Sequence, residues 1–205
     1  MNGEQPARIV FRPIGSPLPL GFSGLFVATL LLSGLQLDWL EPADGQIVAF
    51  SLLLFAAPVQ LVTSLLAYAA RDGTVGTGMG ILGATWLTVG VSLLSLPPGA
   101  TSDGLGLLFV TAGAAMLAPA ISAVGSKPLA AAVLGTAAVR LALSGVYNLS
   151  SSEGWENAAG VVGLVLAAMA AYAIFAFELE QSGRSFPPTA RRDAATAEPG
   201  VRPEL

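Results

Sequence analysis

The chain has 205 residues, of which 54% are hydrophobic and only 11% are charged, whereas soluble domains average roughly 25% charged residues. It has no cysteine and no histidine, which excludes disulfides, Cys/His zinc sites, thiol nucleophiles and histidine-based acid–base catalysis. The net charge of −4 is small, and nothing resembles the basic face of a nucleic-acid-binding protein. We therefore expect an all-α membrane protein that is not an enzyme and holds no cofactor or metal.

Six long apolar segments follow one another, each near the roughly 20 residues that a helix needs to cross a bilayer. The breaks between them are rich in Gly, Pro, Asp and Ser, which end helices and form turns. The segments lack the alternation typical of strands in a membrane β-barrel. They cover residues 18–37, 46–68, 75–96, 104–124, 129–148 and 158–177. The sequence therefore predicts a six-transmembrane-helix bundle.

The two ends of the chain are polar. The basic start before Leu18 could belong to a signal peptide, but the apolar stretch that follows is longer than a signal-peptide core of roughly 7–15 residues, so we expect a retained span. The other end is rich in Pro, Arg, Ala and Thr, as in a disordered tail. The expected organisation is an N-terminal segment over 1–17, a transmembrane domain over 18–178 and a cytoplasmic tail over 179–205.

The positions of the basic residues predict the orientation. Apart from Arg140, they lie in the N-terminal segment, the second and fourth loops and the tail, whereas the other three loops carry only acids. With six spans, all basic segments fall on one side, which the positive-inside rule assigns to the cytoplasm. We expect a multi-pass protein of the cytoplasmic membrane with both termini in the cytoplasm. The basic residues are Arg8, Arg12, Arg71, Lys127, Arg184, Arg191, Arg192 and Arg202.

Arg140 lies near the centre of the fifth span. A charge at that depth costs at least about 2.5–3.5 kcal/mol and usually faces a cavity or a partner. Thr136, Ser144 and Asn148 stand at steps of four from it and share its helix face. In one interpretation Arg140 faces a water-accessible path and binds carboxylates through its forked guanidinium. In the other it forms a structural ion pair with an acid such as Glu178.

Further polar side chains lie on other spans. Gln60, near the middle of the second span, needs a partner in another helix or in water, which fits either a polar path or an interhelical hydrogen bond. Pro58 and Pro119 are expected to kink their helices. Polar stripes on several helices together favour a central path, although small polar residues also pack helices. The stripes are Thr29, Ser33 and Gln36 on the first span and Thr85, Thr88 and Ser92 on the third.

Four stretches carry motifs: S-P-L-P-L-G-F (Ser16–Phe22), A-A-P-V-Q-L-V-T-S-L-L-A-Y (Ala56–Tyr68), G-A-T-W-L (Gly83–Leu87) and A-G-V-V-G-L-V-L-A-A-M-A-A-Y (Ala159–Tyr172). In that order they resemble N-P-A-P-L-G-L, G-G-L-A-Q-x-x-A-G-x-x-E-Y, Y-G-x-F-W-L and A-G-W-I-G-x-x-x-G-x-x-A-x-Y. These are stretches of the acetate uptake transporter family, which includes the succinate–acetate permeases. Gln60 falls on the family's glutamine and Trp86 on its tryptophan. The resemblance extends from Ser16 to about Arg184.

The resemblance implies hexamers in which six helices surround a narrow path for small monocarboxylates or dicarboxylates, gated by a ring of bulky side chains. The family's first-span aromatic falls on Leu25, with Phe26 adjacent, and its third-span tyrosine falls on Leu82. Leu134 is the candidate for the fifth-span leucine. The family's second-span glutamate is Ala67 here. The implied constriction is therefore aliphatic.

The start of the first span adds an electrostatic element. Ser16 replaces the family's asparagine, and Pro17 and Pro19 lie where a helix begins, which tolerates proline. The free N–H groups and the positive dipole end of that helix would attract an anion. The expected path residues are Ser16, Pro17, Pro19, Thr29, Gln60, Trp86, Arg140 and Ser144.

We therefore expect a transporter or channel for small carboxylates, acetate first and succinate second, with proton coupling left open. Small residues on the third span (Gly76, Gly80, Gly83) and the sixth (Gly160, Gly163) permit close helix contact within or between protomers, and with the resemblance they suggest a homo-oligomer. A non-transporting membrane scaffold or accessory subunit of the same fold is the main alternative. A membrane enzyme is a weaker one, because no convergent set of titratable groups is present.

Overall fold

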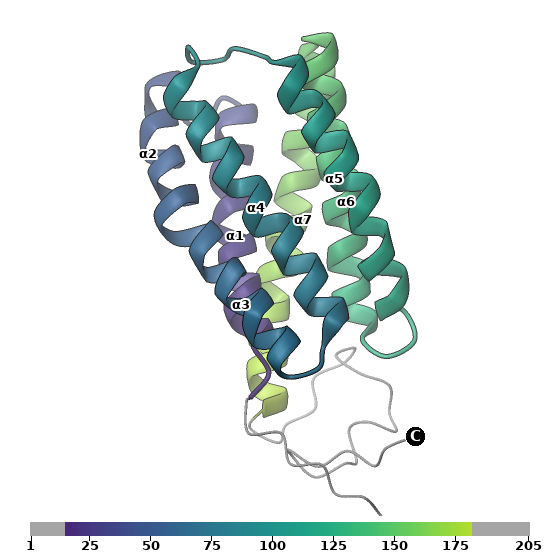
Figure 1. The fold of residues 1–205 in the computed structure, drawn as a ribbon. Helices are drawn as coiled ribbons and strands as arrows, with labels where there is room; N and C mark the ends of the chain where they lie inside the picture. The colour runs from purple at the N-terminus through teal and green to yellow at the C-terminus, as the bar shows by residue number, and fades with distance from the viewer. Residues whose placement is uncertain (1–14, 182–205) are drawn as a thin grey trace, which may run out of the picture.

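The computed structural model describes residues 15–181, which form a bundle of long helices (Figure 1). Six helical stretches are long and apolar enough to cross a membrane. They are α1 (Leu18–Gln36), the continuous stretch Pro42–Ala69, α4 (Gly73–Ser95), α5 (Asp103–Ala123), α6 (Pro128–Ser150) and α7 (Glu153–Gln181). The all-α membrane fold and the six predicted spans are thus confirmed. Most of the predicted N-terminal segment 1–17 and tail 179–205 lies outside the described residues, so both stay predictions.

The second span changes its helical geometry along its length. It begins with a single 3₁₀ turn, η1 (Pro42–Asp44), continues as α2 (Gly45–Ser51), widens into a π-helical turn, η2 (Leu52–Ala56), and ends as α3 (Ala57–Ala69). Pro58 is the second residue of α3, just after the π turn, and lacks the N–H that an α-helix requires there. The disturbance expected at Pro58 therefore takes the form of a π turn. Pro119, by contrast, lies inside α5, which continues past it to Ala123.

Polar residues define the ends of the spans. Asp38, Arg71 and Ser151 adopt left-handed backbone angles, with φ between 51° and 58°, a conformation that stops a helix. Asp72 then caps α4, because its carboxylate accepts a hydrogen bond from the N–H of Val75 at 3.3 Å. The turn residues noted in the sequence thus end one span and begin the next.

The spans form a closed ring. Going round it, α1 packs against α3, α3 against α4, α4 against α5, α5 against α6, α6 against α7, and α7 returns to α1. Figure 1 shows α4 in front, α2 and α3 on one side, α5 and α6 on the other, and α1 and α7 behind. The first and last spans are therefore neighbours. One face of each span therefore points into the interior of the ring.

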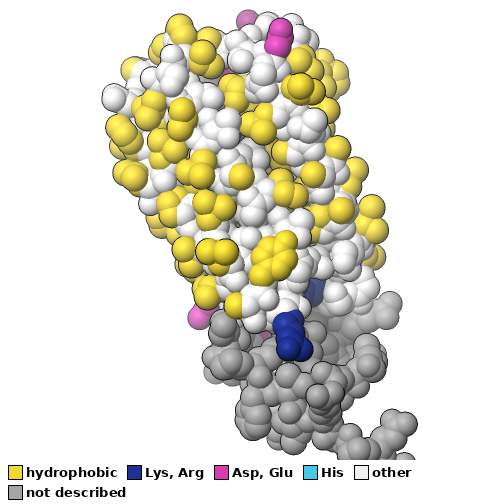
Figure 2. Space-filling view, viewed as in Figure 1, with side chains coloured by type: hydrophobic (Ala, Val, Ile, Leu, Met, Phe, Trp, Pro, Cys, Tyr) yellow, Lys and Arg dark blue, Asp and Glu magenta, His cyan; other side chains and the backbone are white. Residues whose placement is uncertain are grey.

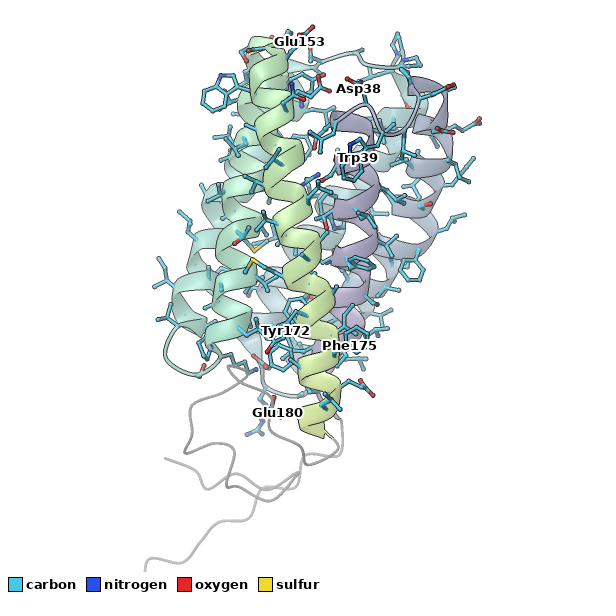
Figure 3. All side chains as sticks on the ribbon, turned by 180° about the vertical axis from the view of Figure 1, so that it is seen from behind. Asp38, Trp39, Glu153, Tyr172, Phe175 and Glu180 are labelled. Atoms are coloured by element: carbon cyan, nitrogen blue, oxygen red, sulfur yellow. The ribbon has the colours of Figure 1, made fainter. Side chains whose placement is uncertain are left out.

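The two ends of the ring carry different charges. We call the end at which residues 15 and 181 lie the terminal end, and the other the opposite end. Arg71 and Lys127 lie in loops of the terminal end, where Lys127 forms an ion pair with Asp72. On the face seen in Figure 2, Lys and Arg side chains lie at this end, whereas acidic side chains lie at both ends. Asp38 and Glu153 are labelled there in Figure 3.

The outer surface between the two ends is apolar. Large side chains such as Leu54, Leu65, Ile121 and Phe175 are about 70% or more exposed, and Figure 2 shows hydrophobic side chains over the length of the visible face. A soluble monomer rarely exposes so continuous an apolar surface. The arrangement fits helices that face lipid.

Candidate functional site

Polar side chains are buried inside the ring. Four of the spans contribute them: α1, α3, α4 and α6. Several are satisfied within the protein, because the hydroxyls of Thr29, Thr63 and Thr85 donate to carbonyls of their own helices at 2.7–2.8 Å. Such bonds are common in membrane helices and indicate no ligand. The buried polar residues are Thr29, Ser33, Gln60, Thr63, Ser64, Thr85, Arg140, Ser144 and Asn148.

Other buried polar atoms have no hydrogen-bond partner within the described part of the protein. Four of them are N–H donors or hydroxyls, and the fifth is an amide oxygen nearer the terminal end. A buried polar group without a partner is unusual in native proteins and calls for an explanation. The five atoms are Ser33 Oγ, Trp86 Nε1, Arg140 Nε, Ser144 Oγ and Gln60 Oε1.

Arg140 is the centre of this group. Its side chain is 1% exposed, and its Nη2 donates to Oε1 of Gln36 on α1 at 3.2 Å. The guanidinium carbon lies 6.0 Å from the centre of the Trp86 ring on α4, a cation–π distance. No carboxylate of residues 15–181 forms an ion pair with it. The ion pair with Glu178 is therefore wrong, since the partner of Arg140 is a neutral amide.

A close approach of α7 completes the surroundings of Arg140. A Cβ atom at Gly163 would overlap Ser33 Oγ and would lie 2.6 Å from Arg140 Nε. Ser33 Oγ and Arg140 Nε therefore lie against the same stretch of α7 backbone. Ser144 follows Arg140 by one turn of α6, a rise of about 6 Å. Residues of α1 and α6 are thus brought together against α7, and Trp86 of α4 lies beside Arg140.

Gln60 occupies a second level, nearer the terminal end. Its Nε2 donates to the main-chain oxygen of Gly21 on α1 at 3.3 Å and lies 3.9 Å from Met79 Sδ on α4. The interhelical hydrogen bond considered from the sequence is thus present, and Oε1 has no partner in the described part of the chain. The place of Gln60 on a polar path stays a prediction.

Large apolar side chains are buried in the same interior. Leu25, Leu82 and Leu134 are buried, at 0–2% exposure. Leu134 packs over Gly78, one turn before Leu82 on α4, and its Cδ2 lies 3.0 Å from the place of a Cβ there. Phe26 is only half-buried and packs at the margin of the core. The three leucines come from different spans, α1, α4 and α6.

The start of α1 lies at the terminal end. Ser16 is exposed just before the helix, while Pro17 and Pro19 are buried, and the carbonyl of Pro17 accepts the N–H of Gly21 at 3.1 Å. Nearby, the rings of Phe22 and Phe177 stack with centres 5.7 Å apart. The helix α1 therefore begins at Leu18, between Pro17 and Pro19, as the two prolines predict.

Other polar residues singled out in the sequence lie on the outside or are satisfied by hydrogen bonds within the protein. Thr88 is exposed on the outside of α4, and Ser92 donates to the carbonyl of Thr88. Thr136 donates to the carbonyl of Ala132 at 2.9 Å, and Asn148 accepts from the N–H of Ser102 at 3.2 Å. Gly163 was noted only as a small residue. Its role against Arg140 has no sequence signal beyond the absence of a side chain.

The fold and the site together define a class: an integral membrane protein in which six spans form a ring around a mixed polar and apolar interior. No family model matches the sequence, and no curated protein matches it. Among solved structures, the fold is similar to that of the bacterial acetate channel SatP, with a TM-score of 0.76 and 25% sequence identity. The match covers 86% of this chain and 99% of the channel.

This match confirms the resemblance to the acetate uptake transporter family that the motifs indicated. It also agrees with the expectation that the chain is not an enzyme, since the similar protein is a channel.

Proposed function

We propose that this chain is a membrane channel or transporter for acetate. The observation that carries the proposal is the likeness of nearly the whole chain, in fold and in sequence, to a bacterial acetate channel. The buried polar atoms without protein partners give independent support, because an interior that only packs helices would satisfy them. Succinate and coupling to protons are finer alternatives that the transport assay below separates.

The proposed path runs along the inside of the ring. An anion enters at the start of α1, near Ser16, Pro17 and Pro19, where free N–H groups and the helix dipole favour negative charge. It then meets the polar amide of Gln60. Thr29 lies further along α1, and Trp86, Arg140 and Ser144 receive the anion beyond the apolar level.

The proposed constriction consists of Leu25, Leu82 and Leu134, with Phe26 at its margin. Such an apolar ring blocks hydrated ions, since it offers nothing to replace their water. A small acid with a methyl group crosses it more easily. Buried aliphatic side chains from three different spans support this assignment.

The proposed location is the cytoplasmic membrane, with the terminal end in the cytoplasm. The basic loops of the terminal end and the acidic loops of the opposite end support this orientation. Arg71 and Lys127 represent the basic residues among those described, and Asp38 and Glu153 represent the acids.

We also propose a homohexamer, on the family resemblance alone. The glycines that suggested close contact between protomers are used inside the protomer: Gly76 packs on Tyr68, Gly83 on Leu61 and Gly160 on Leu37. They therefore do not argue for an interface. Native mass spectrometry in mild detergent tests the assembly, and a monomer across a wide concentration range would contradict it.

Uptake of radiolabelled acetate into proteoliposomes tests the proposed function. Acetate should enter faster than into protein-free vesicles and should compete with unlabelled acetate. Runs with and without a pH gradient, and with labelled succinate, separate the finer alternatives. A folded, reconstituted protein without acetate flux would instead support the scaffold alternative.

A further inference from the structure

We propose that Arg140, Ser33, Ser144 and Trp86 form a binding site for one ionised carboxylate group, and that this site favours monocarboxylates over dicarboxylates. The inference rests on the proposed function and adds to it a fixed site, separate from the apolar constriction. On α6, Arg140 lies six residues after Leu134, about 9 Å further from the terminal end.

The first argument is charge. An arginine stays protonated in proteins. This one is buried within a span, and among the described residues its side chain forms a single hydrogen bond, to the neutral Gln36 amide. A buried cation without an anion is costly, and contact with the Trp86 face offsets only part of that cost. An anionic ligand supplies the missing charge.

The second argument is the balance of donors and acceptors. Arg140 Nε–H and Trp86 Nε1–H can only donate, and the hydroxyls of Ser33 and Ser144 can donate as well. All four side chains are at least 98% buried, and these atoms lack protein partners. A ligand that brings only acceptors satisfies them, which describes a carboxylate. A neutral amide brings donors of its own and fits less well.

The third argument concerns the number of charges. The other basic residues among those described, Arg71 and Lys127, lie at the terminal end, and Lys127 is paired with Asp72. A second carboxylate near Arg140 would therefore find no cation in the described part of the spans. The site thus fits acetate and related monocarboxylates, while succinate would leave one charge unpaired.

Trp86 provides a reporter for this site. The chain has three tryptophans, and the other two, Trp39 and Trp155, are 64% and 44% exposed. In the full chain with Trp39→Phe and Trp155→Phe, fluorescence comes from Trp86 alone. The purified protein is titrated at neutral pH with acetate, acetamide and succinate, and calorimetry on the same preparation measures binding independently of the fluorophore.

We expect a saturable response to acetate, none to acetamide at the same concentrations, and an affinity for succinate at least about tenfold weaker, which corresponds to 1.4 kcal/mol. Acetamide matches acetate in size but lacks the charge. An equal response to acetamide, or no binding of acetate by either method, overturns the site. Succinate binding as tight as acetate overturns the preference for monocarboxylates.

Substitutions test whether the response to acetate depends on Arg140. Arg140→Gln should abolish acetate binding, and Arg140→Lys should retain a weaker affinity, because charge survives without the forked geometry. Arg71→Gln, in an exposed loop, is the matched control and should bind as the parent does. Unaltered acetate binding in Arg140→Gln contradicts the assignment. If that variant does not fold, the comparison of acetate with acetamide decides.

Acetate flux measured on the same preparations distinguishes this inference from the proposed function. Flux without acetate binding at Trp86 means that the channel exists and the Arg140 site does not. Absence of both flux and binding contradicts the proposed function as well.

Discussion

The side chain of Gln60 on α3 donates from Nε2 to the main-chain oxygen of Gly21 on α1, 3.3 Å away. The bond joins the second span to the beginning of the first, inside the ring. The other amide atom, Oε1, has no hydrogen-bond donor among residues 15–181. Gln60 therefore combines a packing role with an open acceptor at the level where the proposed path begins.

Gln60→Leu should lower acetate flux several-fold, because it removes the polar atoms from the path, and should cost about 0.6–1.7 kcal/mol of stability through the lost interhelical bond. Flux in proteoliposomes and thermal melting measure the two effects. Thr63→Val is the matched control, since Thr63 is equally buried but bonds within its own helix. Equal losses of flux in both variants would place Gln60 in packing alone.

Leu82→Ala should admit larger acids and speed acetate flux, because a smaller ring lowers the steric and dewetting barrier. Uptake of acetate, propionate and butyrate measures the size limit. The cavity is expected to cost about 2–5 kcal/mol of stability, so melting is recorded as well. Leu87→Ala, partly exposed on the same helix, should leave the size limit unchanged. An unchanged limit in Leu82→Ala means that Leu82 only packs.

Gly163→Ala should destabilise the protein by about 1–3 kcal/mol, because the added methyl group overlaps Ser33 and presses on Arg140. Acetate flux should fall as well, because the side chains of Ser33 and Arg140 must move to make room for the methyl group. Gly135→Ala is the control: no atom lies within 4 Å of its added Cβ, so it should be neutral or gain up to about 1 kcal/mol from helix propensity. Similar melting of the two variants would contradict the close approach of α7.

The absence of cysteine in the chain allows a clean test of orientation. Ala43→Cys introduces a thiol at the opposite end and Ser126→Cys one at the terminal end, and both positions are exposed. A membrane-impermeant maleimide should label position 43 in intact cells and position 126 only after permeabilisation. The reverse pattern would show that the terminal end faces outward.

The six spans could be predicted because a bilayer forces each apolar stretch to satisfy its backbone within one helix, and because Pro, Gly and Asp mark the breaks. The rotation of each helix about its own axis, which decides which face points inward, could not be predicted, because it depends on packing against neighbouring spans. Ser33 and Ser92 belong to similar stripes, yet only Ser33 is fully buried. In α4, Gly83 and Gly90 pack against Leu61 and Leu53, which turns Thr88 outward.

The candidate site shows the same limit. Arg140 was visible as a charge in an apolar run, and its polar neighbours on α6 followed from helical periodicity. Its contacts with Gln36 and Trp86 depend on the packing of α1 and α4 against α6. The π turn before Pro58 also had no signal beyond the proline itself, because several local geometries can relieve a missing N–H.

Because α1 and α7 are neighbours and their aromatic rings stack at the terminal end, the ring has no gap between the first and last spans. The order of the spans round the ring would survive if residues 15 and 181 were joined by a linker and new termini were opened in the loop around Ser126. The fold is thus compatible with circular permutation. On the side of the terminal end, the chain could begin at its present ends, in the loop around Arg71 or in the loop around Lys127 without changing the order of the six helices.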